Sequence, residues 1–166
     1  MTGTAGLTGL AGCSWVSDPS SGGPAYEARE IDDGPVFDPG LQEATERDYA
    51  AALVVTESDA ELFDFARLSE ADAAFVDETD FEVSYLGVIQ VSALRSSMRF
   101  EVVDIHESDV NLTVNVAVRD DEPRSDDLVI TTLLLRVARE GDAPPGNIAV
   151  ELDIGEHHET FSGSRP

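Results

Sequence analysis

Apolar and polar residues alternate along the second half of the chain, most regularly over residues 112–118. Successive side chains of a β-strand point to opposite faces, so this pattern predicts a strand with one buried face. A slip of one residue would move the polar set into the core, and the register of this strand should therefore be firm. The residues expected on the buried face are Leu112, Val114, Val116 and Val118.

Several other segments are expected to form strands, and turn residues separate them. Ser58-Asp59 precedes residues with helical spacing, so we predict one short helix over Asp59–Arg67 and a further short turn over Ser69–Phe75. The sequence thus predicts a mostly β fold, an antiparallel β-sandwich or open barrel of about seven strands with one short early helix. The remaining expected strands are 49–56, 81–91, 98–105, 129–137, 148–152 and 159–161.

The composition changes along the chain in a way that predicts its domain organisation. Residues 1–13 are small or apolar, and residues 14–47 contain Pro and Gly every few positions without periodicity. We interpret the first segment as a truncated signal and the second as a flexible acidic linker. The β domain is expected over residues 48–162, followed by a tail over residues 163–166.

The charge of the chain excludes some partners. All 10 basic residues are Arg, against 34 Asp and Glu, which gives a formal net charge of −24. No basic stripe exists to neutralise phosphates, so we expect no nucleic-acid partner. Ionic strength near 1 M shortens the screening length to about 3 Å and removes most of the self-repulsion. We therefore predict a protein that requires high salt, the alternative being an ordinary acidic protein.

Leu10-Ala11-Gly12-Cys13 precedes the polar linker and contains the single Cys of the chain. This segment resembles the lipobox of secreted lipoproteins, and with its Gly- and Leu-rich approach it looks like the end of a twin-arginine signal from halophilic archaea. The resemblance implies a lipid on Cys13 and a location on the extracellular face of the cell membrane. No stretch approaches the roughly 18 apolar residues of a spanning helix. The alternative is a soluble cytoplasmic protein in which Cys13 is a free thiol.

The order of segments within the β domain carries a second resemblance. The segments concerned are Ala52–Val55, Glu57–Glu61, Asp80-Phe81, Val83–Val91, Phe100–Val102, Leu112–Val116 and Leu133–Val137. Their order is similar to that of the C-terminal domain of PrcB-type protease-complex subunits, and the similarity covers residues 50–152. The resemblance implies a small β domain that binds a partner or assists a protease complex, and it supplies no catalytic residues. The segment over residues 92–100 lacks the glycines of the family's turn, so a function of that turn is not carried over.

Few residues stand out as candidate sites. Asn111-Leu112-Thr113 is a sequon, which predicts glycosylation of Asn111 if the protein is exported. One segment of the acidic chain places basic residues beside an aromatic residue, and it contains Arg95, Arg99 and Phe100. We predict that these three residues contact a partner. The alternative for the two arginines is pairing with neighbouring acids of the same chain.

Metal and catalytic chemistry is not indicated. His157 and His158 are adjacent, so on a strand they point to opposite faces and do not share one metal easily. The acidic loop over residues 120–127 lacks the glycine turn and ligand spacing of a calcium loop. No nucleophile elbow, phosphate loop or zinc-protease motif is present in the sequence. We expect a non-enzymatic lipoprotein that binds protein or peptide partners and needs no metal or cofactor, with an enzyme of unrecognised type as a further alternative.

Overall fold

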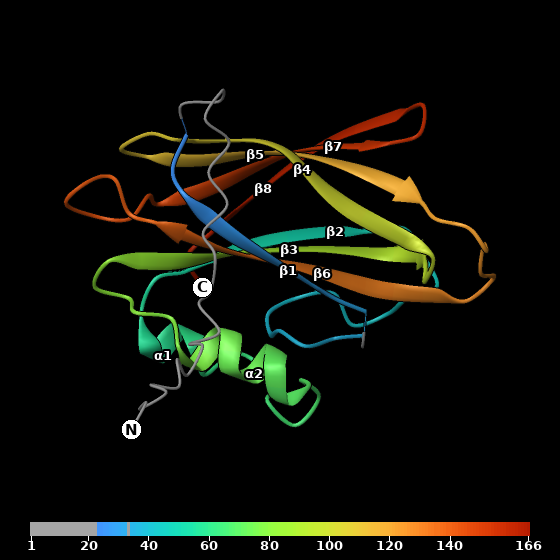
Figure 1. Ribbon diagram of the computed structural model, residues 1–166, viewed down its shortest axis with the longest axis horizontal. Helices are drawn as coiled ribbons and strands as arrows, with labels where there is room; N and C mark the ends of the chain where they lie inside the picture. The colour runs from blue at the N-terminus through green and yellow to red at the C-terminus, as the bar shows by residue number, and fades with distance from the viewer. Residues whose placement is uncertain (1–22, 33) are drawn as a thin grey trace, which may run out of the picture.

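The computed structural model describes residues 23–32 and 34–166 (Figure 1). Strands take up 51% of the chain and helices 8%, which confirms the mostly β prediction. Within the described residues the elements are β1 (Tyr26–Ile31), β2 (Tyr49–Val54), α1 (Glu57–Ala60), α2 (Glu70–Asp77), β3 (Ser84–Arg95), β4 (Met98–Glu107), β5 (Asn111–Asp120), β6 (Leu128–Ala138), β7 (Asn147–Ile154) and β8 (His157–Ser164).

The eight strands form one sheet that curls into a nearly closed barrel. Their order is β1-β6-β3-β2-β8-β7-β5-β4, so β1 and β4 are the two edge strands. Most neighbours are antiparallel, as predicted, but β2 runs parallel to β8 and β5 runs parallel to β7. The alternation of side chains determines which face of a strand is buried, but it does not determine the neighbour of that strand, and the two parallel pairs were therefore not predicted.

The barrel interior is the main hydrophobic core, and it contains alternate residues of the strands. Leu112, Val114 and Val116 of β5 lie inside and are at most 1% exposed. Their register is continuous, from Asn111 opposite Asn147 to Val118 opposite Ile154 of β7. The predicted buried face of this strand is thus confirmed.

A second core lies outside the barrel, between one wall and the helices (Figure 1). Leu86 and Val88 of β3 and Leu134 of β6 face outward into this core, where Val76 of α2 and Phe63 cover them. Since β3 and β6 are buried on both faces, their sequences are almost continuously apolar rather than alternating. In the part of the chain that the structure describes, no helix covers the wall formed by β4, β5, β7 and β8 (Figure 1).

The helices differ from the predicted helix over residues 59–67. Thr56 and Asp59 form a capping box at the start of α1, but this helix ends at Ala60. Phe63 then forms a bridge with Phe37, and their ring centroids lie 4.9 Å apart. The helical spacing of the apolar residues therefore reflected contacts with a distant segment. Ser69 caps α2, which occupies the region predicted as a short turn.

Part of the predicted linker over residues 14–47 belongs to the barrel. Strand β1 pairs with β6 along its whole length, from Tyr26 opposite Val137 to Ile31 opposite Thr132. The segment after β1 is fixed by Gln90, whose side chain is buried and accepts the Leu41 N–H at 3.0 Å. Of the predicted linker, β1 is thus a strand of the sheet, and Leu41 is held against β3.

Two halves of the sheet meet where β2 and β8 cross. The only residues of the described chain that pair there are Ala52 and Ser164. A Cβ atom on Gly163 would lie 1.7 Å from the Ala51 carbonyl oxygen, so a glycine is required at this close approach.

Candidate functional site

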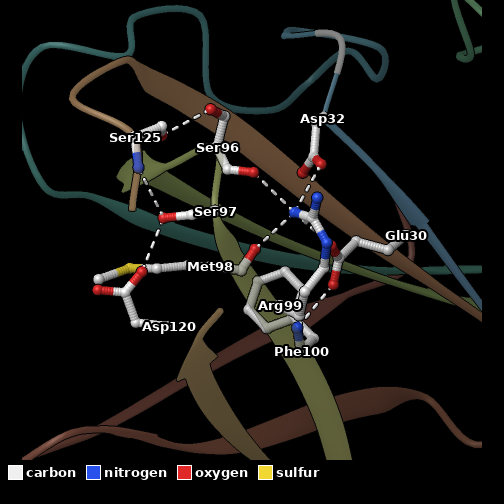
Figure 2. A network of polar contacts seen from close by, with 9 residues as sticks. All are labelled: Glu30, Asp32, Ser96, Ser97, Met98, Arg99, Phe100, Asp120 and Ser125. Atoms are coloured by element: carbon white, nitrogen blue, oxygen red, sulfur yellow. Dashed lines mark hydrogen bonds and ion pairs between the residues drawn. The ribbon is translucent and has the colours of Figure 1, made fainter. Parts of the chain in front are cut away.

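The barrel closes where β1 and β4 face each other, a region we call the seam (Figure 2). The Glu30 carboxylate of β1 accepts the backbone N–H of Phe100 of β4 at 2.6 Å. Arg99 lies 3.4 Å from Glu30 and 3.0 Å from Asp32. Further along the seam, Gly23 lies directly against the Ile105 carbonyl group. The two edge strands are thus joined mainly through side-chain contacts rather than a continuous ladder of backbone hydrogen bonds.

The candidate partner-binding residues take part in contacts within the chain. Arg99 also donates to the carbonyl oxygens of Ser96 and Met98 (Figure 2), and the Phe100 ring packs against the barrel core. Arg95 lies 3.3 Å from Asp120, which also accepts the hydroxyl of Ser97. The structure therefore shows for both arginines the intramolecular pairing that was the alternative to partner contact.

Burial raises the pKa of the Glu30 carboxyl above its ordinary value. The Phe100 N–H and Arg99 act against this effect, whereas Asp32 and Asp121 add to it by repulsion. The ionised carboxylate is thus less favourable in the folded than in the unfolded protein. It destabilises the fold at neutral pH, and the destabilisation disappears as the pH falls through the raised pKa.

We expect Glu30→Gln to be at least as stable as the wild type at neutral pH, because Gln is neutral and its carbonyl still accepts the Phe100 N–H. The difference in the free energy of unfolding should shrink as the pH falls through the raised pKa. Urea unfolding at several pH values measures it. Glu101→Gln, which removes an exposed ion pair with Arg119 on the same side of the barrel, is the control and should have a small effect. A difference that grows on acidification would contradict the assignment.

The other sequence candidates lie apart from the seam. Asn111 is exposed at the start of β5, and Cys13 lies outside the described residues. In β8, His157 is opposite Ile154, whereas His158 is opposite Asp153 and contacts it at 2.7 Å. That contact raises the pKa of His158. Residues 23–32 and 34–166 contain no group of three or more His, Cys, Asp or Glu that is placed to hold a metal ion.

A groove that the sequence analysis did not identify lies on the helix side of the barrel. One part, with a volume of about 320 Å³, lies between α1, α2 and Phe81, and a second part of about 600 Å³ shares Glu57, Thr79 and Phe81 with it. These volumes fall in the range of small-ligand sites. We call it the helix groove and define it by Val55, Thr56, Glu57, Ser58, Ala60, Glu61, Phe65, Val76, Asp77, Thr79, Asp80, Phe81 and Glu82.

The helix groove has an apolar floor and an acidic rim. Ala60 and Val76 are buried in its floor, while the Phe65 side chain is 38% exposed and Phe81 is half-buried. Among the described residues, the charged side chains of the rim are all acidic and exposed: Glu57, Glu61, Asp77, Asp80 and Glu82. The groove thus combines an apolar surface, which can bind apolar side chains, with carboxylates, which attract cations.

Buried polar contacts hold the floor of the helix groove in place. Arg136 of β6 is 6% exposed and donates to the Thr79 hydroxyl at 3.1 Å and to the Phe75 carbonyl at 2.5 Å. Its guanidinium stacks over the Phe75 ring at 4.3 Å and pairs with Glu27 of β1 at 2.7 Å. Arg139 donates to the Phe81 carbonyl at 2.7 Å. Two arginines of the sheet region therefore position the residues that follow α2.

Sequence reasoning missed the helix groove because its residues fitted other patterns. Phe65 matched the apolar spacing of the predicted helix, and Phe81 matched the alternation of the predicted strand over 81–91. In the structure Phe65 lies beyond the end of α1, and Phe81 lies in a turn before β3. The one available signal was the group of acids around Phe81 at Asp77, Asp80 and Glu82, but such groups occur throughout this chain.

Comparison with known proteins finds no matching family model, no similar curated protein and no similar solved structure. In the described part of the chain no helix is long and apolar enough to cross a membrane.

Proposed function

We propose that this chain is a barrel-based, non-enzymatic binding module that holds a protein or peptide partner in the helix groove. The observation that carries the proposal is the combination, in one groove of about 320 Å³, of exposed aromatic surface, a buried apolar floor and unpaired charge. Burial of apolar side chains supplies affinity, and the polar rim supplies selectivity. The firm attachment of the floor to the barrel supports a preformed site.

The seam favours the helix groove over the sheet edges as the partner site. A peptide that adds to a sheet needs an edge strand with free N–H and C=O groups. Here the edge strands β1 and β4 face each other, and the Phe100 N–H already donates a hydrogen bond to the Glu30 carboxylate. The resemblance to PrcB-type subunits makes a component of a protease complex one candidate partner.

The binding function is tested by selecting, from a random peptide library, the peptides that bind the full chain in about 1 M KCl. We expect a family of related peptides whose binding Phe65→Ser weakens at least about tenfold, since the change removes an aromatic contact. Val103→Ser is the matched control, because Val103 is 59% exposed on the opposite wall. The proposal fails if no family of peptides is enriched, or if both substitutions weaken binding equally.

We further propose that a lipid on Cys13 fixes the module to the extracellular face of the cell membrane, with the sequon at Asn111 as a site of glycosylation. The support is the lipobox-like Leu10-Ala11-Gly12-Cys13, together with the exposure of Asn111 at the start of β5. Two acyl chains make a stable anchor, whereas one makes a marginal anchor. A soluble cytoplasmic protein with a free thiol is the rival.

The intact mass of protein extracted from the membranes of native cells separates these two locations. We expect a chain that begins at Cys13 and carries the added mass of a diacylglyceryl group. Cys13→Ser should move the protein from the membrane fraction to the soluble fraction. An unmodified chain that starts at Met1, or a Cys13→Ser variant that still sediments with the membranes, would support the cytoplasmic alternative.

A further inference from the structure

The helix groove has acidic groups that pair with no cation of the described residues. Within residues 23–32 and 34–166, the carboxylates of Glu57, Glu61, Asp77 and Glu82 make no ion pair or side-chain hydrogen bond. The sequence contains no Lys, and each of its 10 Arg side chains makes another contact. Arg136 and Arg139 contact the Thr79 hydroxyl and the Phe81 carbonyl of the groove, but within the described residues neither pairs with these four carboxylates. The contacts are Arg29–Asp72, Arg47–Ala93 carbonyl, Arg67–Asp64, Arg95–Asp120, Arg99–Asp32, Arg119–Glu101, Arg124–Asp120, Arg136–Glu27, Arg139–Phe81 carbonyl and Arg165–Pro144 carbonyl. Among the described residues no basic side chain pairs with these four carboxylates, so a positive group of a partner can pair with them.

The arrangement of the rim favours an organic cation over a metal ion. Metal ions need several ligands that converge on one point, and no group of three acids or histidines in the described chain is placed to do so. The carboxylates stand instead around an apolar floor that contains Ala60 and Val76. A long side chain with an apolar stem and a charged end matches such a surface, because the stem covers the floor while the end reaches the rim.

Two features select arginine among such side chains. Glu57 begins α1 and Glu61 caps its end, so the two acids lie four residues apart, and both line the groove. A planar guanidinium has donors on several sides and can bridge two carboxylates, whereas an ammonium acts as a point charge. The guanidinium also stacks on aromatic rings, and Phe65 and Phe81 line the same groove.

We infer that the helix groove recognises an arginine side chain of a partner peptide, flanked by an apolar residue. The guanidinium pairs with Glu57 and Glu61, and the stem and the neighbouring residue cover the floor. This inference rests on the proposed peptide-binding function and adds the chemistry of the partner. A hydrated salt cation at the rim is the competing occupant.

Peptide titration against the full chain tests the inference. The probes are Gly-Leu-Arg-Phe-Gly, with blocked ends and a neutral fluorophore, and the same peptide with citrulline, the neutral isostere, in place of Arg. Binding is measured by fluorescence anisotropy in about 1 M KCl, because this salt concentration screens the long-range attraction between the peptide and the net charge of the protein. We expect the Arg peptide to bind at least about tenfold more tightly than the citrulline peptide.

Paired variants locate the preference. Glu57→Gln with Glu61→Gln should make the two peptides bind equally. Asp142→Asn with Glu156→Gln removes the same charge from exposed sites away from the groove and should leave the preference unchanged. Neutral isosteres keep the shape of α1, and circular dichroism verifies that both variants fold.

The outcomes separate this inference from the function on which it rests. Equal binding of the two peptides to the wild type, with loss of both in Phe65→Ser, overturns the arginine preference while the groove remains a peptide site. A preference for Arg that both paired variants reduce equally reflects net charge and also overturns the inference. If neither peptide binds, the inference fails, and the library selection decides independently whether the groove binds peptides at all.

Discussion

Transfer of the protein from about 1 M to about 0.01 M KCl should abolish its cooperative thermal unfolding transition, because the screening length rises from about 3 Å to about 30 Å. The chain carries 34 acidic and 10 basic side chains, and its arginines already have partners within the chain. Most carboxylates therefore face only like charges at low salt. Folding brings these charges together, so the repulsion destabilises the compact state.

Far-UV circular dichroism during heating, at a series of KCl concentrations, measures this dependence. The same series in NaCl is the control, since screening depends on ionic strength and the two salts should then give similar midpoints. A transition that keeps its midpoint and cooperativity at low salt would contradict the predicted salt requirement and would favour an ordinary acidic protein.

Glu27→Ala should lower the free energy of unfolding by about 3–5 kcal/mol, the cost of leaving a buried charge without its partner. The Glu27 and Arg136 side chains are 8% and 7% exposed, and their charged atoms lie 2.7 Å apart. Removal of the carboxylate leaves the Arg136 guanidinium in the interface between β6 and α2 with only neutral acceptors. The same change should loosen the residues that follow α2, because Arg136 holds Thr79 and Phe75.

Urea unfolding at constant, high KCl measures this loss without changing the ionic strength. Asp64→Ala is the matched control: it breaks the exposed pair with Arg67, whose side chains are 53% and 51% exposed, and should cost less than about 1 kcal/mol. Similar losses in the two variants would mean that the Glu27–Arg136 pair does not hold α2 to the barrel.

Strands with one buried and one solvent-exposed face could be predicted from the sequence, whereas β1 could not. Glu27 and Arg29 fall on the face of β1 that the helices cover, where they pair with Arg136 and Asp72. A strand whose buried face carries charges has no apolar alternation, so Tyr26–Ile31 resembled a linker. The partners that neutralise these charges lie 43 or more residues away, and no local pattern reveals them.

Neither the seam nor the helix groove could be predicted, for a related reason. Arg99 was correctly identified as a cation among acids, but its partner Asp32 lies 67 residues away. The groove combines α1, the segment after it, α2 and the turn before β3, which meet only when α1 and α2 pack on the sheet. Periodicity describes single elements, and both features arise from contacts between elements that are separate in the sequence.

The crossing of β2 and β8 at Gly163 has a consequence for biosynthesis. In the sheet order, β8 is the strand that connects the half containing β1, β6, β3 and β2 with the half containing β7, β5 and β4, and it is the last of the described strands to leave the ribosome. Without β8 the sheet order is interrupted between β2 and β7, and the edges of these two strands are open to pairing with other strands. Completion of the barrel therefore waits for translation of residues 157–164, and a nascent chain needs protection from aggregation until that point.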